Sequence, residues 1–345
     1  MTTTSPRSTP LGRREAARAR ARLSALVREE LSARGYEEVE TPILVPAPGM
    51  EPHIDAFASA FVPEGGGASR PLWLHTSPEY AMKRLLAEGF PRTFQLARVF
   101  RNGEVSATHN PEFTMLELYR AGAGAEPVME DVEQLVEAAA RRIAGTTRVR
   151  WRGQELDLTA PFERVTMREA FRARAGIDLG EVGDDVGRLR AAARAAGLDA
   201  GRESDSFDDL FFRIFLERVE PGLGSPRPAF LTEWPVSMAA LARVKPGDPR
   251  WAERFELFAG GLELANGFAE LTDAAEQRRR LVEEQALRRR LGRPVYPLDE
   301  PFLEAVGRMP DAGGVAVGFD RVLMLLVGAR EIADVLLFPA EDFVP

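Results

Sequence analysis

The spacing of apolar side chains predicts a long helix and then several strands in the first third of the chain. Near-helical spacing from Arg13 predicts a helix that Gly35 ends. Its apolar stripe consists of Ala16, Leu23, Leu26, Val27 and Leu31. The following pattern predicts a strand over 38–41 closed by Pro42, strands over 72–75 and 94–100, and between these a helix over 78–87 that Ser77 could cap.

The same two patterns continue to the end of the chain. Apolar residues from Val128 to Ile143 mark an amphipathic helix, and helices near 184–197 and 205–219 make residues 145–225 a mostly helical insertion. The remaining elements are expected as strands over 229–233, 252–259 and 262–268, a charged helix over 273–291, a strand over 313–319 and a helix over 320–326. Scattered strands with long connections predict an α+β fold with a mainly antiparallel sheet.

Length and apolar content allow one large domain or two average ones, and we expect one domain over residues 13–345 after a disordered tail over residues 1–12. The chain has 345 residues, of which 45% are apolar, and this is enough for a sizeable core. The first 23 residues are rich in Arg, Ser and Thr, which also resembles an organelle transit peptide. We favour a short tail followed by an Arg-rich helix.

Charge and composition exclude several classes of function. A formal net charge of -8 argues against a protein that mainly grips nucleic acid, because such binding depends on Lys and Arg contacts to phosphates. The chain has no cysteine, which excludes thiolate-bound zinc, iron-sulfur clusters and thioester intermediates. No apolar run approaches the roughly 18 residues of a membrane span. We therefore expect a cytoplasmic protein without membrane contact.

A predicted hairpin brings two carboxylates onto one face of a sheet. Gly260-Gly261 is a favourable two-residue turn, so residues whose numbers sum to 521 should face each other. Glu256 then becomes a diagonal neighbour of Glu263. The pair is either part of a solvated face with arginine partners or a site for a hard cation such as Mg²⁺. Alternation puts Glu270 on the other face unless Asn266-Gly267 forms a bulge.

Two arginines and a phenylalanine are candidates for nucleotide binding. Arg101 offers a bidentate fork suited to a phosphate, and Phe113 offers a flat face for a base, although a lone Phe is usually core and a lone Arg usually surface. Arg321 falls in the first turn of a predicted helix, where the macrodipole disfavours a cation. A salt bridge to Asp320 or a neighbouring acid would explain Arg321, and stacking on a purine is the alternative.

These segments resemble the signature motifs of class II aminoacyl-tRNA synthetases, and most closely the lysyl branch. Residues 101–102 with 109–119 (HNPEFTMLELY) are similar to motif 2, residues 314–325 (GVAVGFDRVLML) to motif 3, and residues 35–42 (GYEEVETP) to the motif 1 helix and strand that build a homodimer. Residues 76–79 (TSPE) and 263–271 (ELANGFAEL) add two further matches. The resemblance covers residue 13 to the end.

Within that branch, the chain resembles the elongation factor P (R)-β-lysine ligases, a family of synthetase paralogues. Only about a dozen residues precede the first helix, which leaves no room for the anticodon-binding barrel of lysyl-tRNA synthetases, and Ala316 stands where the ligases have Ala and the synthetases Gly. The resemblance implies ATP-dependent activation of (R)-β-lysine, or lysine, as an adenylate and its transfer to a lysine of elongation factor P, without tRNA. The alternatives are lysine activation for tRNA and a non-catalytic paralogue.

The resemblance also implies a role for each motif residue. Arg101 would be the catalytic residue that holds the α-phosphate, and Glu256 with Glu263 would bind Mg²⁺. ATP would contact Arg101, Asn102, Gly103, Glu104, His109, Asn110, Phe113, Glu263, Leu264, Gly318 and Arg321. The amino acid would contact Ser77, Pro78, Glu79, Glu117, Tyr119, Asn266, Glu270 and Ala316.

The chain departs from the family pattern at two positions in motif 2. The families usually have Arg-Asn-Glu where this chain has Arg101-Asn102-Gly103-Glu104. Either a local loop shift brings Glu104 to the adenine, which we favour, or one contact to the base is lost. Thr108 stands where lysyl-tRNA synthetases have a second basic residue, so the contacts to the leaving pyrophosphate would differ.

Overall fold

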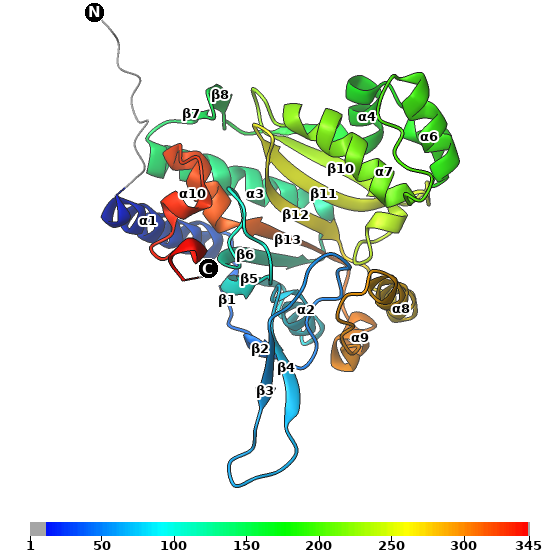
Figure 1. The fold of residues 1–345 in the computed structure, drawn as a ribbon. Coiled ribbons are helices and arrows are strands. Elements are labelled where there is room, and N and C mark those ends of the chain that lie inside the picture. The colour runs from blue at the N-terminus through cyan, green and yellow to red at the C-terminus, as the bar shows by residue number, and fades with distance from the viewer. Residues whose placement is uncertain (1–11, 344–345) are drawn as a thin grey trace, which may run out of the picture.

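A sheet of eight strands runs through the centre of the molecule (Figure 1). The structure is a computed structural model that describes residues 12–343, so the predicted tail lies outside the described residues except for Gly12. The strand order is β1-β5-β6-β13-β12-β11-β10-β9. Only the two edge pairs, β1 with β5 and β9 with β10, are parallel. The predicted α+β fold with a mainly antiparallel sheet is confirmed.

The sequence prediction located most of these strands. The central sheet consists of β1 Glu37–Glu38, β5 Arg92–Phe100, β6 Glu112–Ala121, β9 Glu163–Thr166, β10 Ala229–Pro235, β11 Trp251–Ala259, β12 Leu262–Ala269 and β13 Ala312–Gly318. Two small sheets accompany it, formed by β2 Leu44–Val45, β3 Ala58–Phe61 and β4 Arg70–Leu74, and by β7 Arg148–Trp151 and β8 Gln154–Asp157. The hairpin of β3 and β4 projects away from the body of the molecule (Figure 1).

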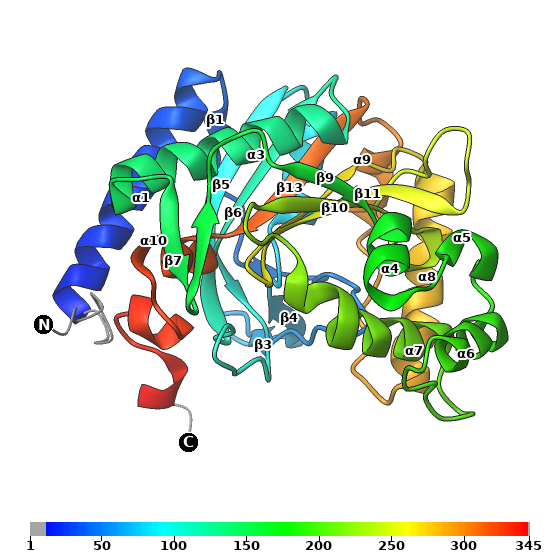
Figure 2. The same ribbon diagram turned by 90° about the horizontal axis from the view of Figure 1, so that it is seen from above.

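One face of the central sheet is covered by three helices. These are α1 Arg13–Ala33, α3 Ala125–Ala139 and α10 Phe319–Val327, which pack with the strands into the largest apolar core (Figure 2). The predicted stripe of α1 is buried in this core, and Leu31 is completely inaccessible. Truncating such a leucine to alanine typically costs about 2–5 kcal/mol.

The opposite face, which we call the site face, carries two separate groups of helices. The first group consists of α2 Glu79–Ala87, α8 Ala274–Arg290 and α9 Glu300–Val306. The second consists of α4 Met167–Ala175, α5 Leu179–Val182, α6 Val186–Ala195 and α7 Phe207–Ile214, and it packs on β10 and β11. The central strands between these groups hold the polar residues described below. Among residues 12–343, none of the helices combines the length and the apolar content that a membrane span requires.

Two predicted elements differ from the structure. The strand expected over 38–41 is only Glu37–Glu38, and its pairing to β5 ends after Val39, whose N–H bonds the carbonyl of Phe94 at 2.9 Å. The insertion expected to be helical over 145–225 begins instead with strands β7, β8 and β9, and its helices start at α4. Val149 and Trp151 are buried between exposed arginines, so a short period of two was missed there.

The predicted hairpin turn is confirmed, but the bulge lies elsewhere. Phe258 pairs with Glu263, as the sum of 521 requires, and Gly260 and Gly261 both have positive φ (59° and 74°), as a type I′ turn demands. The register then shifts, so that Leu264 is the extra residue and the expected bulge at Asn266-Gly267 is wrong. Because Leu264 stays outside the ladder, the alternation of side chains between the two faces is reversed after it, and Glu263 lies on the same face as Asn266.

Candidate active site

A row of directly opposed residues crosses the site face over five strands. Gln95 pairs with Glu117, Glu117 with Ala316, Ala316 with Asn266, and Asn266 with Glu256. Four of the five were predicted as site residues from three separate motifs. The sheet register therefore brings the predicted amino-acid and metal residues together, with Ala316 in the middle.

The next row of opposed residues along the strands shows why position 314 is a glycine. Tyr119, Gly314 and Phe268 are directly opposed, two residues from Glu117, Ala316 and Asn266 respectively. A Cβ atom on Gly314 would lie 2.3 Å from Glu270 Oε1 and 2.3 Å from Tyr119 Cε1. Side chains with a Cβ do not fit there, so Gly314 lets two predicted substrate residues approach each other.

Buried Lys83 joins two of the predicted carboxylates. Its ammonium lies 2.5 Å from Glu79 Oε1, one turn earlier on α2, and 2.6 Å from Glu270 Oε2. Burial alone would lower the pKa of Lys83, but Glu270 and Glu79 together raise it above its ordinary value. Burial raises the pKa of Glu270 to about 7 even though Lys83 opposes the shift. Oε1 of Glu270 accepts no hydrogen bond.

Glu117 lies beside this cluster without a cation of its own. The Tyr119 hydroxyl donates to Glu117 Oε1 at 2.6 Å, and the Ser77 hydroxyl donates to Oε2 at 2.9 Å. Burial, reinforced by the charge of Glu79, raises the pKa of Glu117 to about 8. Three carboxyl groups, Glu79, Glu117 and Glu270, thus face one lysine ammonium. An amine-bearing ligand would relieve this excess of acid.

The start of α2 follows the predicted capping arrangement in part. The N–H of Glu79 donates to Ser77 Oγ at 3.0 Å, while Pro78 occupies the N-cap position. Ser77 therefore links the first turn of α2 to Glu117 on β6. The substrate residues predicted from the TSPE segment all lie at this junction.

At the other end of the site, Arg101 lies over the ring of Phe113. Its guanidinium carbon is 5.2 Å from the ring centroid, and its Nε is buried without a hydrogen-bond partner. Glu104 Oε2 lies 3.9 Å from Arg101 Nη1, so the displaced glutamate of motif 2 still faces the site. Gly103 has a φ of 85°, and the N–H of Asn102 bonds the carbonyl of Asp55 at 2.7 Å.

Arg321 and His109 form a hydrogen-bonded pair. Arg321 donates to the carbonyl of Glu263 at 3.0 Å and to its Oε2 at 3.3 Å, which identifies Glu263 as the acid that partners Arg321. Asp320 instead accepts from Arg20 and from the N–H of Thr114. Arg321 Nη2 also lies 2.7 Å from His109 Nε2.

This contact determines the protonation of His109. A guanidinium only donates hydrogen bonds, so Nε2 of His109 must accept, and the imidazole is neutral with its proton on Nδ1. Nδ1 lies 2.8 Å from the hydroxyl of Ser106. Burial and the charge of Arg321 both lower the pKa of His109, in agreement with a neutral ring. Gly318, at the N-cap of α10, lies three residues before Arg321.

Glu256 and Glu263 offer the oxygen ligands that a hard cation prefers. Glu256 is 6% exposed and accepts from Arg254 Nη2 at 2.6 Å. Burial raises the pKa of Glu256 to about 8, Arg254 opposes this shift, and Glu263 adds to it. Among the described residues there is no group of three or more metal-ligating side chains. Two oxygen donors fit Mg²⁺ completed by substrate phosphates.

Two predicted ATP residues have structural roles in this arrangement. Asn110 donates to the carbonyl of Glu112 at 2.6 Å and accepts from the N–H of Ala340 at 2.8 Å, so its side chain ties motif 2 to the C-terminal segment. Leu264 is buried in the core on the helix-covered face, so only its main chain is left to approach a ligand. The geometry gives no support to a side-chain contact between either residue and ATP.

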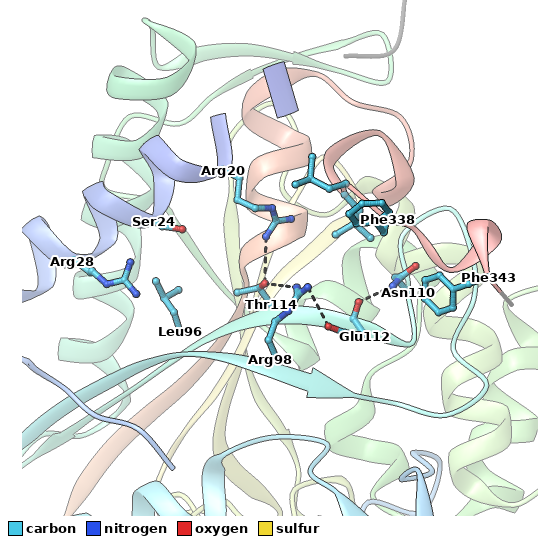
Figure 3. Close-up of a pocket in the computed structure, with 12 residues that line it drawn as sticks. Arg20, Ser24, Arg28, Leu96, Arg98, Asn110, Glu112, Thr114, Phe338 and Phe343 are labelled. Carbon is cyan, nitrogen blue, oxygen red and sulfur yellow. Dashed lines mark hydrogen bonds and ion pairs between the residues drawn. The ribbon is translucent and has the colours of Figure 1, made fainter. Parts of the chain in front are cut away.

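A cavity of about 500 Å³ lies on the opposite face of the sheet from the acidic cluster (Figure 3). It is bounded by α1, β5, β6 and the C-terminal segment, and its lining includes Arg20, Arg98, Glu112 and Phe338. The arginines are already paired, Arg20 with Asp320 and Arg98 with Glu112. Its chemistry and its face both separate this cavity from the candidate active site.

Sequence reasoning missed three residues that contact the site. Lys83 could have been found, because it follows Glu79 by four residues on a helix and is one of only two lysines. Arg254 precedes Glu256 by two residues on β11 and therefore shares its face. Glu51, on the irregular segment before β3, had no pattern that marked it.

Comparison with known proteins identifies the family. The family model described as tRNA synthetases class II (D, K and N) matches residues 11–342. The chain belongs to the class II aminoacyl-tRNA synthetase family. The matched range includes every segment that contributes a residue to the candidate site.

Its relatives within this family carry two different names. The elongation factor P (R)-β-lysine ligase of Erwinia tasmaniensis is 39% identical over 325 residues, which are 93% of this chain and 94% of the relative. The lysine–tRNA ligase of Pelotomaculum thermopropionicum is 37% identical over 322 residues, which are 93% of this chain but 62% of the relative. A lysine–tRNA ligase of a Synechococcus strain is 40% identical, and the chain spans 64% of its length.

Proposed function

We propose that this protein activates (R)-β-lysine with ATP and joins it to a lysine side chain of elongation factor P. The observation that carries the proposal is the buried acidic cluster of Glu117 and Glu270 on the site face and Glu79 at the start of α2, with Ala316 directly opposite Glu117. Such a cluster suits a substrate with two ammonium groups. Ala316 carries a methyl group where lysyl-tRNA synthetases have glycine, which reduces the space for the amino acid. The β-lysine ligase relatives align over nearly their whole length.

The first step would be nucleotidyl transfer without a covalent enzyme intermediate. An oxygen of the amino-acid carboxylate attacks the α-phosphorus of ATP, the bond from that phosphorus to the bridging oxygen breaks, and pyrophosphate leaves. Arg101 neutralises charge that develops on the α-phosphate, and the neighbouring site orients the two reactants. The adenine would lie between Phe113 and Arg321. No thiol takes part, because the chain has no cysteine.

Glu256 and Glu263 would hold Mg²⁺ in this step. The ion would supply charge neutralisation at the phosphates when bound. Arg254 keeps the Glu256 carboxylate oriented through the 2.6 Å contact, and Arg321 does the same for Glu263. The protein thus presents two fixed oxygen donors on one side of the nucleotide.

The second step would be aminolysis of the adenylate. The uncharged amine of the acceptor lysine attacks the activated carbonyl carbon, an amide bond forms, the acyl–phosphate bond breaks, and AMP leaves with the loss of one proton from the amine. The acceptor belongs to a translation factor, so we place the protein in the cytoplasm. Mass spectrometry of elongation factor P incubated with enzyme, ATP and (R)-β-lysine should show a gain of one lysyl unit. An unchanged mass, with adenylate formation intact, would defeat the acceptor assignment.

We further propose that the protein is a homodimer. Ile43 and Leu44, directly after the motif 1 segment, are 43% and 42% exposed, and Phe338 at the cavity on the helix-covered face is 72% exposed. Apolar side chains of this size are candidates for burial against a second copy. Sedimentation equilibrium should give twice the chain mass, and a Phe338→Asp variant should dissociate more readily.

Lysine activation for tRNA is the second candidate, favoured by the relatives named lysine–tRNA ligase at 36–40% identity. It predicts that α-lysine is the better substrate and that tRNA becomes charged. Parallel assays of tRNA aminoacylation and of elongation factor P modification, with α-lysine and (R)-β-lysine in each, separate the two functions.

A further inference from the structure

Glu51 is a carboxylate beside the site that no motif includes. It lies on the segment between β2 and β3, and its Oε2 is buried without a hydrogen-bond partner. A Cβ atom on Gly49 would be 2.3 Å from that oxygen and 2.9 Å from Oγ1 of Thr76. Oγ1 of Thr76 is itself buried without a partner, and Thr76 is 1% exposed. Two unpaired polar atoms therefore converge at the absent side chain of Gly49.

The backbone around Glu51 is fixed from two sides. The guanidinium of Arg288, on α8, donates to the carbonyl of Glu51 at 2.6 Å and to that of Ile54 at 2.8 Å. Asn102 of motif 2 bonds the carbonyl of Asp55 at 2.7 Å. The carbonyls of Glu51, Ile54 and Asp55 thus hold the segment in place, while Oε2 of Glu51 is a buried oxygen without a partner. Such an arrangement leaves Oε2 for a ligand.

The charges around Glu51 locate it between the two ends of the site. Burial raises its pKa and the charge of Glu79 adds to this shift, while a hydrogen bond from the residue's own main chain and the charges of Arg101 and Arg288 oppose it. Glu51 is therefore near both the arginine assigned to the α-phosphate and the glutamate at the start of α2. The reacting carboxyl group of the amino acid must lie at Arg101, so Glu51 faces the part of the substrate closest to that group.

We propose that Glu51, together with Glu79, binds the substrate ammonium group nearest the reacting carboxyl group. This inference rests on the proposed activation of a dibasic amino acid. Glu117 and Glu270, deeper in the cluster, then remain for the distal ammonium group. Glu51 is a specificity-determining residue, because it distinguishes an amino acid that carries the first ammonium group from one that lacks it.

The test compares (R)-β-lysine with 6-aminohexanoic acid, which keeps the distal amine and lacks the amine near the carboxyl group. We expect Glu51→Gln to lower kcat/KM for (R)-β-lysine in ATP–pyrophosphate exchange about tenfold or more, because a buried charge-assisted hydrogen bond is lost. The same parameter for 6-aminohexanoic acid should change less than about twofold. Calorimetry of both compounds with the wild type and the variant should show the same pattern in Kd.

Glu283→Gln is the matched control, since this glutamate is exposed on α8 and should leave both substrates unaffected. Equal losses for both compounds would overturn the proposal, because Glu51 would then act on the fold or on Arg101. Equal activity of variant and wild type on (R)-β-lysine would also overturn it. If the wild type activates no dibasic amino acid at all, the proposed function fails as well, and this outcome is distinct from a failure confined to Glu51.

Discussion

Glu117→Gln should make the ligand-free protein more stable at pH 8 while it abolishes amino-acid activation. Glu117 is 1% exposed, and burial next to Glu79 raises its pKa from 4.5 to about 8. Between these two values the folded protein binds more protons than the unfolded chain, so the free energy of unfolding falls as the pH rises. Glutamine does not ionise, so the variant lacks this pH-dependent loss of stability.

The size of the effect follows from the shift. A carboxyl group with these two pKa values lowers the stability by about 4 kcal/mol at pH 8 and by about 1 kcal/mol at pH 5.5. Glutamine also weakens one of the hydrogen bonds from Tyr119 and Ser77, which costs about 1 kcal/mol. The variant should therefore match the wild type at pH 5.5 and exceed it by about 3 kcal/mol at pH 8.

Urea unfolding at the two pH values, without ATP or amino acid, measures this difference. Glu283→Gln serves as the control, because the side chain of Glu283 is exposed and that of Glu117 is buried. ATP–pyrophosphate exchange with (R)-β-lysine, measured on the same preparations, should be lost in Glu117→Gln and kept in the control. A stability difference that is independent of pH, or a variant that is less stable than the wild type at pH 8, would refute the reasoning.

Three further changes test other parts of the site. Arg101→Ala should reduce pyrophosphate exchange by a factor of about 10²–10³, since one charged donor at the developing phosphate charge is removed, and activity near the wild-type level would contradict its role. Gly314→Ala should raise KM for the amino acid and destabilise the fold by about 1–3 kcal/mol, because the added Cβ meets Glu270 and Tyr119 at 2.3 Å; a crystal structure of an active variant with both side chains unmoved would count against this. Lowering the pH from 8 to 6 should weaken binding of (R)-β-lysine about tenfold or more in calorimetry, because Glu117 and Glu270 become protonated and lose their attraction for ammonium groups; a Kd that is constant over this range would exclude them as ligands.

The sequence predicted the parts of the fold that depend on local chemistry. The apolar stripe of α1 is visible in the spacing of Leu23, Val27 and Leu31, and the hairpin of β11 and β12 follows from Gly260-Gly261. The bulge at Leu264 could not be predicted, since leucine has no preference for that position and only the pairing with β11 creates it. The strands β7 to β9 have four residues each, which is too short for a period of two to stand out in the sequence.

The candidate site divides in the same way. Glu256 and Glu263 were expected on one face because a turn fixes register over a few residues. Lys83 meets Glu79 through helical i,i+4 spacing, but its contact with Glu270 and the approach of Glu51 to Glu79 are tertiary, and no spacing rule predicts them. The sequence left the partner of Arg321 open between Asp320 and another acid. Asp320 is bound by Arg20 of α1, about 300 residues away in the chain, and Arg321 therefore binds Glu263.

The extra residue at Leu264 makes the site depend on a count of residues as well as on their chemistry. If Leu264 were paired in a regular ladder, Ala265 would lie opposite Glu256, and Asn266 would lie opposite Phe255 and point into the apolar core. Because Leu264 stays outside the ladder, Asn266 lies opposite Glu256 on the site face instead. A chain without Leu264 would keep these pairs in a regular strand, whereas an additional residue paired between Glu263 and Asn266 would turn Asn266 away from the substrate.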